Sequence, residues 1–320
     1  MSDQAVRLGV IGLGVMGGAM LEVALAAADV TVTGVADQSD ETLARVRAAH
    51  PELTFAAPAD LATADRVDAV YIATPPASHA ELAIAAMRAG KAVFCEKPLA
   101  VDIAEGTRMS DVSVETGMVN VVNFPFATMP ATGYLEQQLL AGAVGEVLAV
   151  DVQLRYPLWP RPFQATATWV GERAEGGFVR EVFSHFSYLT DRLVGPVAAV
   201  DAAVEYPADP TVSEIAAHGL LRAGDVPVHM TGRAGMAGPG ADDWTLWGST
   251  RSYQLRNWTD LYTSDGGPWS PVEMPAGGRG ATLAGLVNAV RGEPSGKLAD
   301  FAAALRVQTA VEAFFGEQSS

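Results

Sequence analysis

Three short segments of the chain carry residue types that could do proton and hydride chemistry. Lys97 lies in Cys95-Glu96-Lys97-Pro98, directly after an apolar run, and a glycine-rich turn from Gly12 to Gly17 ends 80 residues before it. Further along, Glu181 and His185 follow Gly176-Gly177 at a spacing of four. Hydride transfer to or from a nicotinamide needs a dinucleotide site and a group that moves the proton of the reacting oxygen. The three segments together predict such chemistry.

The glycine-rich turn predicts dinucleotide binding. It follows a β-branched run and opens an Ala/Leu-rich segment, which is the strand, turn and helix context that the motif requires. Gly12 would allow the tight turn, Gly14 the close approach of a pyrophosphate, and Gly17 the close packing of helix and strand. The N–H groups at the helix start would bind phosphate oxygens. The predicted cofactor loop consists of Gly12, Leu13, Gly14, Val15, Met16 and Gly17.

Asp37 predicts which dinucleotide is bound. It lies 20 residues after Gly17, at the end of the second predicted strand, where a carboxylate can accept hydrogen bonds from ribose hydroxyls. A 2'-phosphate there would meet like charge, and the neighbours Gln38, Ser39 and Asp40 offer no arginine. The expected cofactor is therefore NAD rather than NADP. The alternative is that this segment only caps the next helix.

Two more segments, 74–79 and 95–98, follow predicted strands of the same sheet. They lie at the carboxyl edge, where open parallel sheets bind ligands. Lys97 could bind the substrate oxygen and stabilise negative charge that develops on it. Glu96 could hold the backbone or a ribose hydroxyl, although a Glu-Lys pair elsewhere is usually a solvated surface pair. Further cofactor contacts are predicted from Thr74, Pro75, His79, Glu96 and Lys97.

Glu181 and His185 are expected one helical turn apart on one face of a helix from about residue 178 to 193. The carboxylate could orient the imidazole. Neutral His185 could then accept an alcohol proton, or its charged form could return one to a carbonyl or imine. The pair could equally be a contact on a helix surface.

Composition and charge favour small-molecule partners. The net charge of -16 would repel phosphate backbones and anionic lipids, so neither nucleic acid nor membrane is an expected partner. No apolar run approaches the roughly 20 residues that span a bilayer. Met1 to Gln4 carry no export signal, and Cys95 is the single cysteine, so a cytoplasmic location is expected. The five histidines are scattered, which predicts no metal site.

Two domains are expected from the length of 320 residues and from a change in pattern after Asn123. Residues 1–123 alternate short strands with helices, which predicts a doubly wound parallel sheet of the Rossmann type in an α/β domain. Residues 124–320 are predicted to form an α+β domain with an open-faced, mainly antiparallel sheet, and a helix over 298–315 is expected to pack back on a core face. The strands are expected at 7–11, 30–36, 69–73, 92–95, 119–122, 147–156, 197–205, 213–222, 226–232, 244–248 and 252–255.

With these motifs in this order, the chain resembles the Gfo/Idh/MocA family, named for glucose-fructose oxidoreductase, inositol dehydrogenase and a rhizopine catabolism protein. The resemblance implies a Rossmann domain, an open-faced second sheet, a homo-oligomer (dimer or tetramer) assembled through that sheet, and oxidoreduction of sugars, cyclitols or related compounds. It also implies that Lys97 and His185 are the usual catalytic pair. The matching segments are 12–17, Asp37, 74–79, 90–99 and 176–185.

The chain departs from the family pattern around the substrate. Glu181 stands where the family commonly has aspartate, and Tyr188 where it has a second acid. An arginine often found after the last strand of the first domain is absent from residues 123–127, which allows a less polar substrate. Aromatic and guanidinium groups before the Gly-Gly segment could form the wall of the substrate pocket, an oligomer contact or a buried clamp. The candidate substrate residues are Asn123, Arg155, Tyr156, Trp159, Trp169 and Tyr188.

The expected function is an NAD-dependent dehydrogenase or reductase acting on CH–OH, or alternatively CH–NH, groups. Two other functions stay open. A lyase or glycosidase of the family would use bound NAD transiently and release no NADH. A cofactor-binding regulator resembling the yeast galactose repressor of this family would not turn over at all, but the presence of both Lys97 and His185 argues against it. The substrate and the direction of the reaction do not follow from the sequence.

Overall fold

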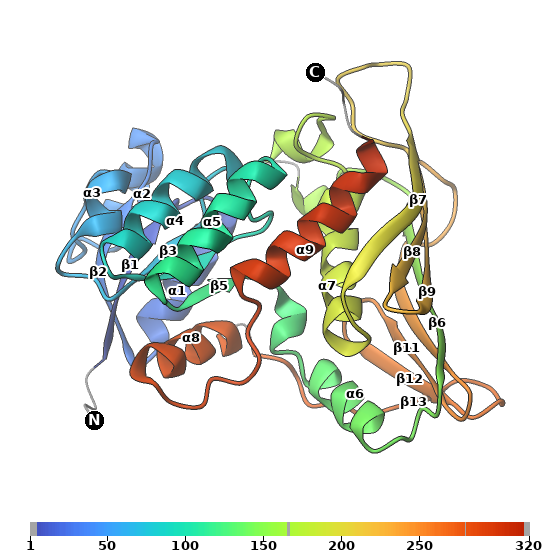
Figure 1. Cartoon of the computed structure of the whole chain (residues 1–320). Helices are drawn as coiled ribbons and strands as arrows, with labels where there is room; N and C mark the ends of the chain where they lie inside the picture. Colours follow the sequence, from blue (N-terminus) through green and yellow to red (C-terminus); the bar gives the residue numbers. More distant parts are fainter. Residues whose placement is uncertain (1–4, 165–166, 279, 317–320) are drawn as a thin grey trace. The chain divides into compact units, whose positions relative to one another are not determined.

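The computed structural model describes residues 5–164, 167–278 and 280–316 (Figure 1). Met1 to Gln4, from which the absence of an export signal was inferred, lie outside the described residues. The chain divides into two compact units. The first consists of Met1–Thr128 and Gly277–Leu305, and the second of Met129–Ala276 and Arg306–Ser320.

The first unit is built on a parallel sheet with the strand order β2-β1-β3-β4-β5. β3 and β4 are buried along their whole length, as expected for parallel strands that are covered on both faces. This confirms the doubly wound α/β fold predicted for this part of the chain. The strands are β1 (Val6–Ile11), β2 (Val30–Ala36), β3 (Ala69–Ile72), β4 (Ala92–Cys95) and β5 (Asn120–Val122).

Helices connect these strands, and one further helix returns to the unit from late in the sequence (Figure 1). That helix, α8 (Ala281–Arg291), buries Leu283, Leu286 and Val287 in the same apolar core as Val6 of β1. The units therefore differ from the expected division at residue 123, because residues 277–305 add to the first core. The connecting helices are α1 (Val15–Ala26), α2 (Asp40–Ala49), α3 (Pro58–Thr63), α4 (His79–Arg88) and α5 (Ile103–Thr116).

The strand order creates a switch point between β1 and β3. The chain leaves β1 for β2 on one side, whereas β3 lies on the other, so the loops after β1 and β3 meet at the sheet's carboxyl edge. Ligands of open α/β sheets bind at this place. The approach is close: a Cβ added to Gly12, whose φ is +90°, would lie 2.5 Å from the carbonyl carbon of Ala73.

The second unit is built on an eight-stranded sheet with the order β13-β12-β11-β10-β6-β9-β8-β7. All neighbours are antiparallel except β6 and β9, which confirms the mainly antiparallel sheet. Two of the strands, β12 and β13, were not predicted. The strands are β6 (Val147–Tyr156), β7 (Val197–Glu205), β8 (Ala216–Ala223), β9 (Val226–Ala234), β10 (Ala241–Gly248), β11 (Ser252–Arg256), β12 (Asp260–Ser264) and β13 (Ser270–Pro271).

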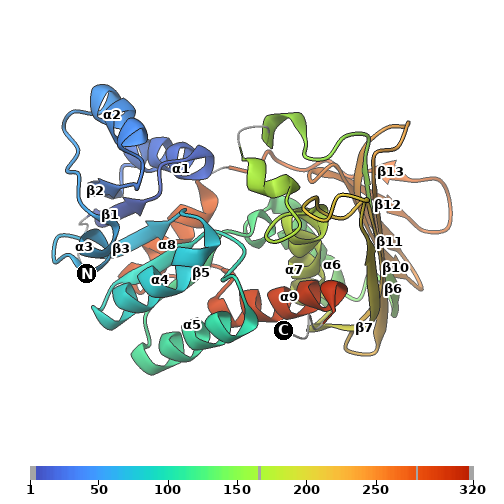
Figure 2. The same ribbon diagram turned by 90° about the horizontal axis from the view of Figure 1, so that it is seen from above.

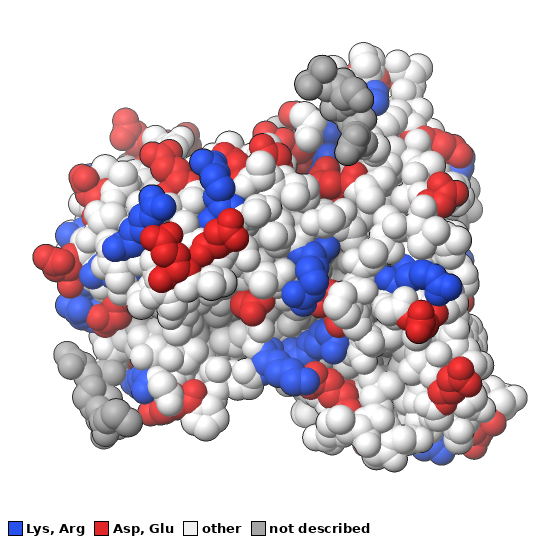
Figure 3. Space-filling view, viewed as in Figure 1, with Lys and Arg blue, Asp and Glu red and all other residues white. Residues whose placement is uncertain are grey.

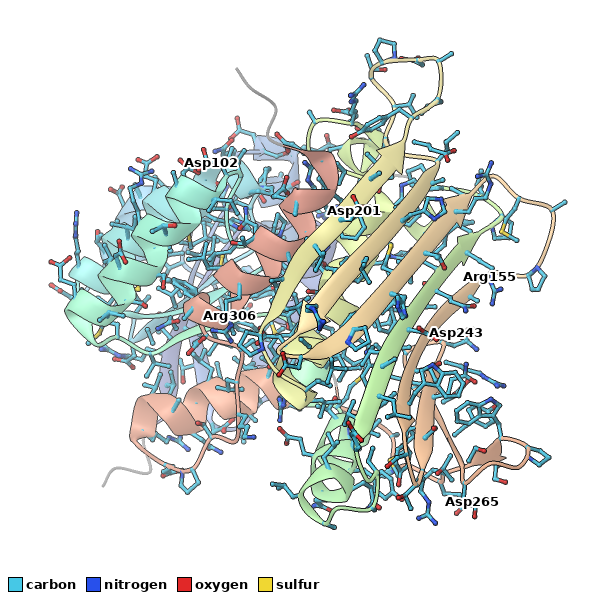
Figure 4. The ribbon with its side chains drawn as sticks, turned by 45° about the vertical axis from the view of Figure 1, so that its right-hand side comes forward. Asp102, Arg155, Asp201, Asp243, Asp265 and Arg306 are labelled. Atoms are coloured by element: carbon cyan, nitrogen blue, oxygen red, sulfur yellow. The ribbon has the colours of Figure 1, made fainter. Side chains whose placement is uncertain are left out.

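One face of this sheet is covered by α6 (Pro130–Leu140) and α7 (Ser184–Leu193), as Figure 2 shows edge-on. The buried indole N–H of Trp244 in β10 donates to Thr190 Oγ1 of α7 at 2.9 Å, which fixes α7 on this face. Figure 4 shows the opposite face, where Arg155 and Asp243 project from the strands and pair at 3.5 Å. That face is open in the described part of the chain.

The C-terminal helix is shorter than predicted. α9 (Phe301–Glu312) is followed by a 3-10 turn, η6 (Ala313–Phe315). Its last part belongs to the second unit, where Arg306 pairs with Asp191 at 2.7 Å and Glu312 with Arg180 at 2.8 Å. No described helix combines the length and apolar character needed to cross a membrane. On the face seen in Figure 3, Lys and Arg side chains are interspersed with Asp and Glu.

Candidate functional site

The glycine turn has the geometry of a phosphate-binding loop. A Cβ on Gly17 would overlap the carbonyl oxygen of Gly12, so the residue must be glycine for the helix to begin there. Gly14 is different, because among the described residues no atom beyond its own chain neighbours lies within 4 Å of an added Cβ. The space above Gly14 is therefore open, at the N-terminus of α1, where N–H groups bind anions. These residues fit a dinucleotide pyrophosphate.

Asp37 is joined to this turn. Its Oδ2 accepts a hydrogen bond from Leu13 N at 2.6 Å, and its Oδ1 accepts one from Ser39 N at 2.8 Å. The cap of α2 is Ser39, whose hydroxyl accepts from Thr42 N, so Asp37 is not the helix cap. A carboxylate offers about four lone pairs. Asp37 can therefore hold the turn and still accept hydrogen bonds from ribose hydroxyls.

An arginine that the sequence neighbours of Asp37 did not reveal also reaches the turn. Arg45 of α2 places Nη2 3.4 Å from the carbonyl oxygen of Leu13. The three residues after Asp37 offer no arginine, but α2 brings Arg45 back to the loop that Asp37 binds.

His79 links the loops that follow β3 and β4. Its Nδ1 lies 3.0 Å from Pro98 O and its Nε2 2.9 Å from Thr74 O, and the residue is 1% exposed. Burial lowers the pKa of the imidazole, which favours a neutral ring that donates to one of these carbonyls. His79 thus holds Thr74 close to the turn after Lys97, and its side chain is used inside the protein rather than offered to a cofactor.

Glu96 is also turned inward. Its Oε1 accepts from the Tyr71 hydroxyl at 2.5 Å and from Asn123 Nδ2 at 2.7 Å. Burial raises the pKa of Glu96, and burial together with the Glu96 charge raises the pKa of Tyr71, which keeps its proton to donate. Oε1 of Glu96 and the amide nitrogen of Asn123, which were predicted to contact a ribose and a substrate, are therefore engaged in this network. Lys97, the next residue, is partly exposed at the ligand edge of the first unit.

Close packing requires glycine at both positions of the Gly176-Gly177 segment in the second unit. A Cβ on Gly176 would overlap the carbonyl oxygens of Trp169 and Val170, and one on Gly177 would overlap the carboxylate of Glu214. Glu214 Oε1 accepts from Val179 N at 2.8 Å. This buried carboxylate, which the sequence did not reveal, therefore caps the helical segment that carries His185. Burial raises the pKa of Glu214 to about 7.

The helix itself differs from the predicted α-helix over 178–193. Val179–Phe183 form a π turn, and α7 begins only at Ser184. A π turn has hydrogen bonds from i to i+5, so the four-residue step from Glu181 to His185 crosses two helix types and the same-face argument does not carry over. Glu181 and His185 are both buried. Single π turns occur frequently at functional sites.

An aromatic side chain lies beside His185. The rings of His185 and Trp258 have centroids 5.0 Å apart and meet at 70°. The indole N–H of Trp258 donates to Asp242 Oδ2 at 2.8 Å, and the same carboxyl group accepts from the Tyr156 hydroxyl at 2.5 Å. The sequence singled out Tyr156 but neither Asp242 nor Trp258.

The other candidate substrate residues fall into different places. Tyr156, Trp159 and Phe178 form an aromatic group, with Trp159 and Phe178 in edge contact at 5.9 Å. Tyr188 is buried in α7, and Trp169 lies in the 3-10 turn η4 (Thr168–Gly171) whose backbone packs on Gly176. Arg155 projects from the open face of the sheet, away from α7 (Figure 4). The structure therefore does not bring Arg155 to His185.

Acidic, histidine and cysteine side chains do not form a metal cluster anywhere in residues 5–164, 167–278 and 280–316. The residues missed by the sequence are Arg45, Tyr71, Glu214, Asp242 and Trp258. Four of them contact a predicted site residue from a distant part of the chain, and Glu214 contacts Val179 of the segment that carries Glu181 and His185. Only the turn at Asn257-Trp258 left a sequence signal, since asparagine is common at the first position of a tight hairpin.

Known proteins share the fold and parts of the sequence. A levoglucosan dehydrogenase of Pseudarthrobacter phenanthrenivorans is 32% identical over 166 residues, which cover 50% of this chain and 42% of that protein. A myo-inositol 2-dehydrogenase of Thermotoga maritima is 27% identical over 216 residues, covering 62% of this chain and 63% of that protein. The chain thus spans less than two thirds of the length of these curated relatives.

A 3-ketoreductase from Actinomadura kijaniata in complex with NADP and TDP-benzene has a TM-score of 0.81 at 22% identity, covering 98% of this chain and 97% of its own. At this identity the likeness establishes the fold. Residues 6–124 match the model of the Gfo/Idh/MocA oxidoreductase family, described by an NAD-binding Rossmann fold. This match covers the five strands of the first sheet and agrees with the motifs at Gly12–Gly17, Asp37 and Lys97.

Proposed function

We propose that this protein is an NAD-dependent oxidoreductase that transfers a hydride between the nicotinamide and a hydroxyl-bearing carbon of a small sugar or cyclitol. The observation that carries the proposal is the glycine turn of the first unit, with open space over Gly14 and with Asp37 bound to Leu13 N at 2.6 Å. The family match over residues 6–124 supports it. When bound, the dinucleotide would supply the hydride acceptor or donor.

In this proposal the first unit holds the cofactor and one charged group. The turn over Gly12–Gly17 would bind the pyrophosphate, and Asp37 the adenosine ribose. Lys97 would donate a hydrogen bond to the reacting oxygen and stabilise its developing negative charge. The hydrogen bonds from Tyr71 and Asn123 to Glu96 would hold the neighbouring backbone, so that Lys97 is presented from a rigid edge.

His185 of the second unit would exchange the proton. In oxidation the substrate carbon gives up its hydrogen with two electrons as hydride, the hydroxyl proton passes to His185, and a carbonyl remains; reduction is the reverse. Glu214 supports this role, because its hydrogen bond to Val179 N fixes the start of the helical segment.

NAD is the proposed cofactor because Asp37 would repel a 2'-phosphate. Arg45 of α2 reaches the glycine turn, and its contact with Leu13 O at 3.4 Å directs the guanidinium to the backbone. Among the relatives, the 3-ketoreductase was crystallised with NADP and a D-xylose 1-dehydrogenase of Haloarcula marismortui is named for NADP. Calorimetric titration with both cofactors tests the choice: NAD should bind more tightly, and a preference for NADP would reverse it.

The substrate class is tested by turnover. The two relatives described above are named for levoglucosan and myo-inositol, a sugar anhydride and a cyclitol. Both compounds and D-xylose should be supplied with NAD and with NADP while the absorbance of the reduced nicotinamide is followed. Formation of NADH with a ring substrate supports the proposal. Tight NADH binding without turnover of any hydroxy compound would refute it and favour the regulator.

We also propose that copies of the chain associate through the open face of the second sheet. Leu220 and Trp247 are exposed there, and exposed apolar groups on a sheet favour protein contacts. Light scattering after size-exclusion chromatography should give a dimer or tetramer. Leu220→Lys should shift the distribution towards the monomer, whereas a wild-type monomer at all concentrations would refute this part.

A further inference from the structure

The turn between β11 and β12 contains an unusual pair of residues. Asn257 and Trp258 have φ values of +48° and +72°, and Thr259 N donates to Arg256 O at 3.2 Å. Both central residues of this turn have positive φ, as in a type I' turn, in which the second position is normally glycine; the loop as a whole consists of residues 257–259 between the paired Arg256 and Asp260. Here a tryptophan occupies that position.

A bulky residue in the left-handed region costs conformational energy, and such strain gathers at functional sites. Among the described residues other than glycine, Asn257 and Trp258 are those with positive φ. Asparagine tolerates this region, but tryptophan gains nothing from it locally. The reason for Trp258 must therefore lie in what its side chain contacts.

The surroundings hold the indole firmly in one place. Asp242 of β10 accepts from the indole N–H at 2.8 Å through its side chain and from Asn257 N at 3.0 Å through its carbonyl oxygen. The ring also packs on Phe186 at 5.3 Å and on His185 at 5.0 Å. Burial raises the pKa of Tyr156, so its hydroxyl keeps the proton that it donates to Asp242 and helps to fix that carboxylate.

This arrangement determines which ligand groups the indole of Trp258 can contact. Its one polar group already donates to Asp242, so the part of the partly exposed ring that can meet a ligand is apolar. The neighbouring imidazole of His185 can form hydrogen bonds. A sugar or cyclitol ring has the complementary character, with a face of C–H groups and a rim of hydroxyls.

We propose that Trp258 is a specificity-determining residue, whose indole packs against the C–H face of a ring-shaped sugar or cyclitol while His185 binds one of its hydroxyls. The inference rests on the proposed function for the proton exchange at His185. It adds the substrate's shape: a six-membered or bicyclic ring is favoured over an open-chain polyol.

The test compares Trp258→Gly and Trp258→Ala, which both remove the indole. Glycine accepts a φ of +72° and alanine does not, so the glycine variant should melt about 2–4 °C higher. Both variants should nevertheless lose about tenfold in kcat/KM for the ring substrate, mostly through KM, whereas Trp258→Phe should lose less. Equal losses at unequal stability would show that the indole acts on the substrate and not only on the fold.

The matched control is Asn257→Gly, which changes the same turn without touching the ring and should keep wild-type kcat/KM.

Binding is measured separately by saturation-transfer NMR with myo-inositol, levoglucosan and glycerol as probes. Wild type should show transfer to the two ring compounds, and Trp258→Gly should lose it. Ring binding without hydride transfer would sink the proposed function but keep this inference. Wild-type kcat/KM in Trp258→Gly, or no transfer from wild type to either ring probe, would overturn the inference.

Discussion

Glu214→Gln should change how the stability of the second unit depends on pH. Glu214 is 2% exposed, and burial raises its pKa from 4.5 to about 7. Between these two pH values the folded state binds the proton and the unfolded state does not, so the stability contributed by this group falls as pH rises through that window and is constant above it. The difference of about 2.5 pH units corresponds to about 3 kcal/mol at 1.36 kcal/mol per unit.

The glutamine variant resembles the protonated acid and does not titrate. We therefore expect it to match the wild type near pH 4.5 and to exceed it by up to about 3 kcal/mol at pH 8, less the charge-assisted part of the hydrogen bond from Val179 N. After that part is subtracted, we expect Glu214→Gln to be at least about 1–2 kcal/mol more stable than the wild type at pH 8.

The assay is urea unfolding followed by tryptophan fluorescence between pH 4.5 and 8. All six tryptophans lie between residues 159 and 269, so the signal reports the second unit. Glu273→Gln, at an exposed position of the same unit, is the matched control. Parallel pH curves for wild type and Glu214→Gln would refute the reasoning, because they would mean that Glu214 titrates alike in both states.

Three further predictions concern the first unit. Asp37→Ala should weaken NAD binding about tenfold or more, and NADP binding less, in calorimetric titrations; equal effects on both cofactors would exclude the ribose contact. Lys97→Ala should reduce kcat by about 100-fold or more while NADH affinity stays within about twofold, and unchanged turnover would remove Lys97 from the mechanism. Tyr71→Phe should lower the free energy of unfolding by about 1–3 kcal/mol, since buried Glu96 loses a donor; an unchanged denaturation midpoint would contradict this network.

Much of the fold could be predicted because its signals are local. Each strand of the first sheet is a short apolar run rich in β-branched residues. The glycine turn is one continuous segment, so all the residues that form it are neighbours in the sequence. α8 is different. Its Leu283, Leu286 and Val287 form an ordinary apolar stripe, and no local pattern indicates that this stripe packs in the core of β1 rather than on the second sheet, whose strands directly precede α8 in the sequence.

The site could be predicted only in part, for a related reason. A motif shows which residue types are present but not whether the protein uses their polar groups itself. Glu96 and His79 were assigned to a cofactor, yet Tyr71, Asn123, Thr74 and Pro98 occupy their side chains. Glu214 and Trp258 reach the His185 segment over 35 and 73 residues, so no spacing rule could have paired them.

The most direct test of the account is NADH titration of Gly14→Val. An added Cβ at Gly14 meets no atom within 4 Å in the described part of the chain beyond its two chain neighbours. A side chain there should therefore leave the fold intact and occupy only the space where a pyrophosphate would lie. Gly18→Ala on the same helix, whose added Cβ would lie 3.7 Å from Leu13 O, is the control. The account predicts that wild type and Gly18→Ala bind NADH while Gly14→Val, with an unchanged circular dichroism spectrum, does not. Undiminished NADH binding by Gly14→Val would contradict it.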